Sequence, residues 1–160
     1  MQKISPFLWF DSSAEQAANF YVSLFSNSRV THVSRYGATA PGEPGAVMSV
    51  SFTLDGLEFQ ALNGGPRYAF TEAISMFIRA DTQAEVDRLW DGLTADGGTP
   101  GNCGWLVDRF GVSWQVVPAA LGEVLGGSDP AGAGRAMQAM LSMQKLDIAA
   151  LRAAYAGTGL

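Results

Sequence analysis

One histidine and one cysteine are the side chains of this sequence that most often carry metal or nucleophile chemistry. His32 lies in a stretch with strand character and has no identifiable partner, so we interpret it as a surface or partly satisfied strand histidine. Cys103 has no histidine near it that would help to form a thiolate, so we interpret it as a structural or cavity-lining cysteine. The sequence therefore offers little support for nucleophilic catalysis.

The segment Asn63-Gly64-Gly65-Pro66 has the glycine content of a phosphate-binding loop. No helix start follows it, so its backbone N–H groups would not be aimed at an anion. We interpret the segment as a turn that links two halves of the chain.

The composition limits the classes of protein to which the chain can belong. Its 160 residues, 48% hydrophobic and 16% charged, suffice for one domain with a hydrophobic core. Ten basic against 15 acidic residues give a net charge of −5, and no basic stripe is present for nucleic acid. The apolar runs are far shorter than the roughly 20 residues needed to cross a bilayer, and no signal peptide is evident. We expect a cytoplasmic protein without a nucleic-acid or membrane partner.

The elements that must position any site occur twice along the chain. Residues 11–15 have the form of a helix capping box, in which Ser12 accepts from the backbone three residues on and Glu15 reaches back. Residues 81–85 repeat this pattern, and an apolar face at helical spacing follows each copy. An offset of 70 residues aligns Phe7 with Phe77, and likewise aligns Phe20 with Trp90. We interpret the repeat as a duplicated unit.

Strand patterns surround each predicted helix. In the first half they cover residues 4–10, 30–36, 46–54 and 57–62, and in the second half residues 73–80, 104–108 and 112–117. Asp55-Gly56 is a hairpin signal, and residues 37–45 read as an exposed loop. Consecutive strands joined by tight turns indicate an α+β fold of two βαβββ modules, about 1–66 and 67–118, in a cupped, mostly antiparallel sheet.

A helical extension follows at residues 119–160. Leu121 to Leu125 and the region around Met137 and Met143 suggest helices. Asp147 has the character of an N-cap, and Gly157 is placed to end the helix that follows it. The apolar face of this extension must pack either on the same domain or on a partner subunit.

The duplicated βαβββ unit resembles the vicinal oxygen chelate superfamily, which includes glyoxalase I, extradiol dioxygenases, and fosfomycin- and bleomycin-resistance proteins. Several segments resemble its PhnB-like branch, the "3-demethylubiquinone-9 3-methyltransferase" domain family. They are residues 4–10, 61–66, 103–108, 110–118 and 139–148. The sequence has no Rossmann-type glycine-rich turn and no repeated parallel βα units, so we do not expect methyltransferase activity.

The resemblance implies four strand positions at which superfamily enzymes hold a divalent metal. Here they are Ile4 or Pro6, then Glu58 with Gln60, then Glu72, and last Gln115, four residues after Gly111. One carboxylate and two amides would bind Zn²⁺ or Mn²⁺ poorly. We therefore expect no metal and no cofactor.

The resemblance and strand alternation together imply a cavity for a small, mostly apolar ligand. If Gln115 faces the cavity, Trp114 faces the helices. On the preceding strand, alternation puts Glu72 and Met76 on one face and Phe77 on the other. The expected ligand-binding residues are Leu8, Gln60, Glu72, Met76, Cys103, Trp105 and Gln115.

The sequence is compatible with three functions. The first is a metal-independent small-molecule binding protein whose ligand is unknown. The second is an enzyme on a small oxygenated substrate, with a metal at Gln60, Glu72 and Gln115 or with Glu72 as general base. The third is a structural or regulatory dimerisation module. Superfamily relatives commonly pair across a two-fold axis, so a homodimer is the default expectation.

Overall fold

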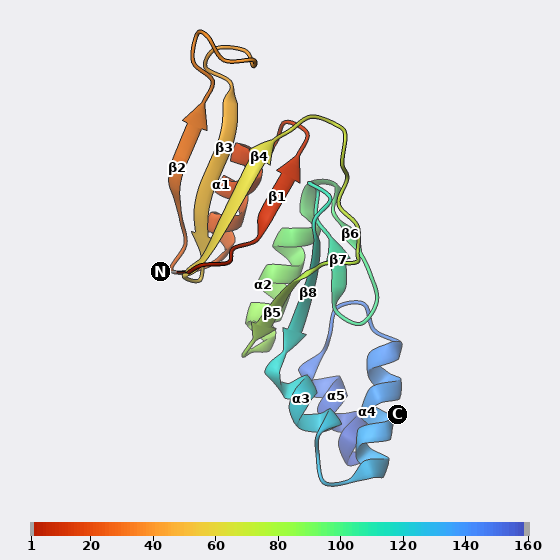
Figure 1. The fold of residues 1–160 in the computed structure, drawn as a ribbon. Helices are drawn as coiled ribbons and strands as arrows, with labels where there is room; N and C mark the ends of the chain where they lie inside the picture. The colour runs from red at the N-terminus through yellow and green to blue at the C-terminus, as the bar shows by residue number, and fades with distance from the viewer. Residues whose placement is uncertain (1, 159–160) are drawn as a thin grey trace. The chain divides into compact units, whose positions relative to one another are not determined.

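Two βαβββ modules follow one another along the chain, and three further helices complete the second. The structure is a computed structural model that describes residues 2–158. The chain divides into two compact units, and the boundary follows Phe70 (Figure 1). The predicted duplicated α+β fold is confirmed, with two four-stranded mixed sheets.

Unit 1 is a four-stranded sheet with one helix on one face. Its elements are β1 (Phe7–Phe10), α1 (Ala14–Leu24), β2 (Arg29–Arg35), β3 (Val47–Leu54) and β4 (Leu57–Asn63). The strand order is β1-β4-β3-β2, with β1 parallel to β4 and the other pairs antiparallel. The β3–β4 hairpin turns at Asp55 and Gly56, which both have positive φ, as the Asp-Gly signal predicts.

The core of unit 1 lies between α1 and the sheet. Small alanines on one face of α1, including Ala17 and Ala18, are fully buried and allow the helix to approach the strands closely. Alternate residues of β3 are buried against the helix, and the ring of Phe52 stacks on Phe59 of β4 at 5.3 Å. This burial leaves the opposite face of the sheet, here called the open face of unit 1, without a covering helix within the unit.

The predicted capping of α1 by Ser12 is wrong. The N-cap residue is Ser13, one residue later, and its side chain makes no capping hydrogen bond. Instead, the side-chain oxygen Oδ1 of Asn63 accepts from the Ala14 N–H at 2.8 Å. A residue at the end of β4 thus supplies the cap.

Unit 2 repeats this plan with shorter strands. Its first elements are β5 (Met76–Ala80), α2 (Gln83–Thr94), the 3₁₀ turn η1 (Ala95–Gly97), β6 (Thr99–Pro100), β7 (Trp105–Val107) and β8 (Ser113–Pro118). The order is β5-β8-β7-β6, with β5 parallel to β8. The predicted capping pattern of α2 is confirmed, because Thr82 Oγ1 accepts from the Glu85 N–H at 3.2 Å and Glu85 accepts from the Asp81 N–H at 2.8 Å.

The predicted helical extension is present in unit 2 as α3 (Ala119–Leu125), α4 (Pro130–Leu141) and α5 (Ile148–Ala156). These helices lie together in the C-terminal part of unit 2 (Figure 1). They share a small core in which Val124, Ala136, Leu146 and Leu151 are buried. Asp147 caps α5 by accepting from Ala150 N at 2.8 Å, and Gly157 ends it at φ 73°, both as predicted.

Gln83 and Lys145 connect this extension to α2. Gln83 Oε1 accepts from the Ile148 N–H at 2.8 Å, and its Nε2 donates to the Leu146 carbonyl at 3.1 Å. Lys145 Nζ lies 3.0 Å from Asp87 Oδ1. Among residues 2–158, no helix is both long and apolar enough to span a membrane.

Candidate functional site

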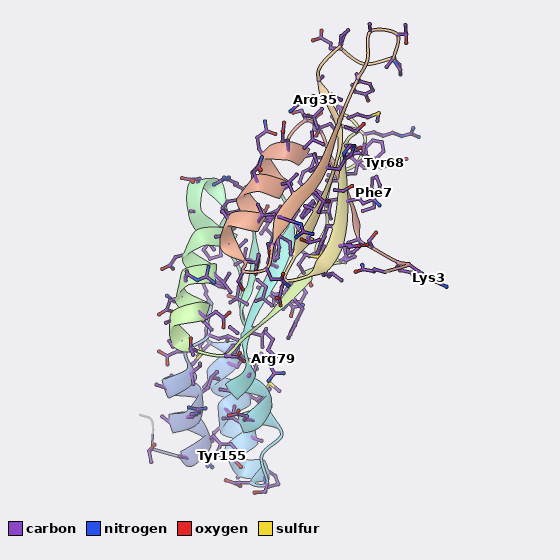
Figure 2. All side chains as sticks on the ribbon, turned by 90° about the vertical axis from the view of Figure 1, so that its left-hand side faces the viewer. Lys3, Phe7, Arg35, Tyr68, Arg79 and Tyr155 are labelled. Carbon is purple, nitrogen blue, oxygen red and sulfur yellow. The ribbon has the colours of Figure 1, made fainter. Side chains whose placement is uncertain are left out.

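A row of side chains crosses the open face of unit 1. The strand register places Phe7 beside Gln60, Gln60 beside Ser51, and Ser51 beside His32. Direct cross-strand neighbours project from the same face with Cβ atoms about 5 Å apart. Phe7 is 56% exposed (Figure 2), and His32 is also exposed. The row therefore combines an aromatic ring, an amide, a hydroxyl and an imidazole on an uncovered surface.

The sheet of unit 2 carries an equivalent row. Its open face is the face opposite Trp114 and Val116, which are buried in the α2 core. The register places Phe77 beside Gln115 and Gln115 beside Trp105. Phe77 is 61% exposed, while Gln115 is half-buried and donates from Nε2 to Ser75 Oγ at 2.9 Å. This hydrogen bond orients the amide and leaves its oxygen Oε1 available to a ligand donor.

The two rows share a phenylalanine–glutamine pair. Phe7 and Gln60 are paired residues of the parallel strands β1 and β4, and Phe77 and Gln115 are paired residues of the parallel strands β5 and β8. The offset of 70 residues that aligns the two modules also aligns Phe7 with Phe77. The duplication has thus placed the same pair at the same position of both sheets.

A buried aspartate fixes which face of β8 carries Gln115. Asp108 is only 3% exposed, and its Oδ1 accepts from the backbone N–H groups of Phe110 and Val112 at 2.8 and 3.0 Å. Its Oδ2 accepts from Trp114 Nε1 at 2.9 Å. Because Trp114 is held in the core, alternation directs Gln115 to the opposite face, as the sequence predicts.

Leu8 and Met76 lie apart from these rows. Leu8 is 7% exposed and alternates with Phe7, so it faces the α1 core. Met76 is in register with Trp114, whereas Phe77 is in register with Gln115. The sequence-based assignment of Met76 to the Gln115 side of β5, and of Phe77 to the other side, is therefore wrong. Side chains alternate within β5 as predicted. Alternation within one strand does not determine which residues of β8 lie beside those of β5.

Glu72 does not lie on a strand. It occupies an exposed turn before β5, which begins at Met76 rather than at the predicted residue 73. The general-base hypothesis requires an acid surrounded by apolar groups. Within unit 2, the exposed position of Glu72 does not provide such surroundings.

Cys103 contacts the helical extension. Its Sγ lies 3.6 Å from the carbonyl oxygen of Met140, and its backbone N–H donates to the Met143 carbonyl at 2.8 Å. The next residue, Gly104, has φ +85° and a backbone N–H that donates to Gln144. These bonds anchor the loop before β7 on the α4–α5 connection, so in unit 2 Cys103 serves a structural contact.

The segment of residues 63–66 also has a structural role. Asn63 caps α1, Gly64 N–H donates to the Phe10 carbonyl, and Trp9 Nε1 donates to the Gly65 carbonyl at 2.9 Å. A Cβ on Gly64 would lie only 2.2 Å from the Trp9 ring, so this close approach requires glycine.

The donor set does not suit a transition metal. Gln60 and Gln115 offer neutral amide oxygens, which are weak ligands for ions that prefer imidazole, thiolate or carboxylate. Within residues 2–158, no group of three His, Cys, Asp or Glu side chains is positioned to hold a metal ion. The residues present thus do not fit the metal that the superfamily resemblance implies.

Three exposed residues of the open faces were not among the candidate site residues from the sequence. Phe7 and Phe77 form a matched pair in the repeat, and both are exposed in the structure. Arg79 follows Phe77 on the same face of β5 and is also exposed. Only the repeat offset contained a signal for the first two, and no pattern singled out Arg79.

Known proteins match the part of the chain that contains both modules. Residues 2–117 match the family described as 3-demethylubiquinone-9 3-methyltransferase. A PhnB protein from Bacillus cereus, described by the same activity, is 38% identical, with a TM-score of 0.69 over 74% of this chain and 100% of its own. A protein from Pseudomonas aeruginosa is 21% identical, with a TM-score of 0.62 over 74% of this chain and 98% of its own, which shows the fold alone.

Comparison with curated proteins finds no match. The family match covers most of the chain and ends before α3. The chain belongs to the family described as 3-demethylubiquinone-9 3-methyltransferase.

Proposed function

We propose that this protein binds small, mostly apolar molecules on the open faces of its sheets, without a metal ion. The observation that carries the proposal is the repeated phenylalanine–glutamine pair, Phe7 with Gln60 and Phe77 with Gln115. Phe7 and Phe77 are each more than half exposed to water, an unfavourable arrangement that a flat apolar ligand would relieve. The neighbouring amide can both donate to and accept from a polar group of that ligand.

The chemistry of the amides supports a metal-independent site. At the position where the superfamily resemblance implies a glutamate, the chain has Gln115, which is hydrogen-bonded to the Ser75 hydroxyl. A neutral amide loses less hydration free energy on burial by an apolar ligand than a carboxylate does. The pair is therefore better suited to hydrogen-bonding an organic ligand than to holding a cation.

Methyl transfer receives no support from the sheet topology. Each sheet contains a single parallel pair, β1 with β4 or β5 with β8, and its remaining pairs are antiparallel. A fold that holds S-adenosylmethionine in a Rossmann manner needs repeated parallel βα units. Binding, rather than the reaction in the family's description, is accordingly the function proposed for this chain.

The proposal includes a homodimer and a cytoplasmic location. Superfamily relatives commonly pair across a two-fold axis, and the resemblance to them supports the homodimer. The single cysteine, Cys103, is a free thiol, which suits a reducing compartment. Sedimentation velocity tests the dimer, since a monomer at every concentration would remove it from the proposal.

A titration with the uncharged fluorescent probe N-phenyl-1-naphthylamine tests the binding proposal. Saturable binding by the wild-type protein is expected. Phe7→Ala and Phe77→Ala should each weaken it by roughly three- to tenfold, because each removes an aromatic contact. The matched control is Leu141→Ala, which removes another exposed apolar side chain, on α4, and should leave the affinity unchanged. Binding that fails to saturate, or phenylalanine variants that bind like the wild type, would contradict the proposal.

A further inference from the structure

A cavity of about 500 Å³ lies in unit 2 where the sheet meets the first helix of the extension. The open face of the sheet contributes Phe77, Arg79 and Val117, and α3 contributes Leu121 and Leu125. Figure 2 shows Arg79 near the junction between the strands and the C-terminal helices. The α3 wall lies beyond residues 2–117, the part of the chain that matches the family. The cavity is therefore built partly by a segment outside that match.

The walls of the cavity are mostly apolar. Val117, Leu121 and Leu125 pack against the core of the extension, so this side of the cavity is held in place by α3–α5. Phe77 also lines the cavity and is exposed. Such a cavity favours a ligand with an apolar body, since these apolar side chains lose contact with water when it is filled.

One positive charge in the cavity has no ion-pair partner among the described residues. Two charged side chains line it, Arg79 and Glu123. Glu123 is paired with Arg152, at 3.3 Å between Oε2 and a guanidinium nitrogen. Arg79 makes no ion pair with any described residue, so its guanidinium is the uncompensated charge. A guanidinium presents paired N–H donors that match a carboxylate.

The spacing of Phe77 and Arg79 specifies the ligand further. They are two residues apart on one strand, so they project from the same face with a separation of roughly 7 Å. An arene joined to a carboxylate by a short carbon chain spans this separation, with the ring on Phe77 and the carboxylate on Arg79.

We propose that this cavity binds an aryl- or alkyl-carboxylic acid, with its apolar part between Phe77 and α3 and its carboxylate on Arg79. The inference rests on the proposed small-molecule function and names the chemical class of ligand for the open face of unit 2. The extension gives the site its second wall.

Calorimetric titrations with 4-phenylbutyrate and with its uncharged amide test this proposal in the full chain. The wild type is expected to bind the acid roughly tenfold or more tightly than the amide, because only the acid gains the charged contact. Arg79→Gln should abolish this preference, and Phe77→Ala should weaken the binding of both compounds. The matched control is Arg88→Gln, which removes the same charge from an exposed position on α2 and should retain the preference.

The outcomes separate this inference from the binding proposal. Equal affinity for acid and amide, or an unchanged preference in Arg79→Gln, would overturn the carboxylate inference. That inference also fails if the acid does not bind to a protein that still binds N-phenyl-1-naphthylamine, and the binding proposal then stands. If the wild type binds neither the acid nor the naphthylamine, both proposals fail.

Discussion

Substitution of Asp108 is the most informative perturbation of this fold, because its one buried carboxylate binds both the β7–β8 turn and Trp114. Its three hydrogen bonds reach the N–H groups of Phe110 and Val112 and the indole of Trp114, at 2.8 to 3.0 Å. In Asp108→Ala these donors lose their acceptor, and the indole donor is buried with Trp114, 3% exposed. If this network positions β8, the variant should be strongly destabilised.

The magnitude follows from two opposing contributions. A hydrogen bond to a charged group stabilises by about 1.5–3 kcal/mol. The substitution also removes the cost of burying a charge, so we expect a net loss of about 3–5 kcal/mol in the free energy of unfolding. At about 2–4 °C per kcal/mol for a chain of this length, the midpoint of thermal unfolding should fall by roughly 6–20 °C.

Asp108→Asn sharpens the test, because an amide has one acceptor oxygen where the carboxylate has two. It can still serve the turn or the Trp114 indole, so its loss should be intermediate, about 1.5–3 kcal/mol. The assay is urea unfolding followed by circular dichroism and tryptophan fluorescence, with the exposed Asp81→Ala as the matched control. A loss below about 1 kcal/mol in Asp108→Ala, or a larger loss in the asparagine variant, would refute this reasoning.

Three other substitutions test the packing and electrostatics. Trp90 is 6% exposed, so Trp90→Ala should lower the free energy of unfolding in urea by about 3–5 kcal/mol. Its repeat counterpart Phe20 is only half-buried, so Phe20→Ala should lower it by less, and equal losses would contradict this. Gln83→Ala removes the bonds to Ile148 and Leu146, so hydrogen exchange in α5 should accelerate roughly tenfold or more, and unchanged exchange would show that Gln83 does not hold the extension. Hydrogen bonds from Gln83 and Lys145 lower the pKa of Asp87 below its usual 3.8, and the hydrogen bond to Asp87 raises the pKa of Lys145 above its usual 10.5. The stability from Asp87 is therefore lost as pH falls through its folded pKa, and that from Lys145 as pH rises through its folded pKa. The difference in the free energy of unfolding between the wild type and Lys145→Met should be constant between about pH 5 and pH 9 and shrink outside that range. The control is Lys3→Met, which removes a lysine without this ion pair and should not show the same pattern.

Most of the local structure could be predicted from the sequence. The Asp55-Gly56 turn, the α2 cap at Thr82 and the ends of α5 at Asp147 and Gly157 were all predicted, because each depends on residues a few positions apart. The α1 cap was not, since its acceptor, Asn63, comes from the end of β4, 49 residues away from Ala14. Patterns along the chain do not encode such a long-range partner.

The candidate site was predictable only in part, for the same physical reason. Alternation correctly separated Gln115 from Trp114 and Met76 from Phe77. It could not determine which residue of β5 pairs with Gln115, because a slip of one residue in a parallel pair exchanges the faces. The cavity at Arg79 depends in addition on where α3 packs after β8. The spacing of the leucines in α3 does not show where this helix packs.

The claim that the phenylalanine–glutamine pairs bind an apolar ligand without a metal is tested most directly by one combined measurement. Purified protein is analysed for its elemental content and the same sample is titrated with N-phenyl-1-naphthylamine, before and after incubation with Zn²⁺, Mn²⁺, Ni²⁺ and Fe²⁺. We predict saturable binding of the probe at the same affinity in every sample, with no stoichiometric metal. A stoichiometric metal ion, or probe binding that depends on one, would contradict the account.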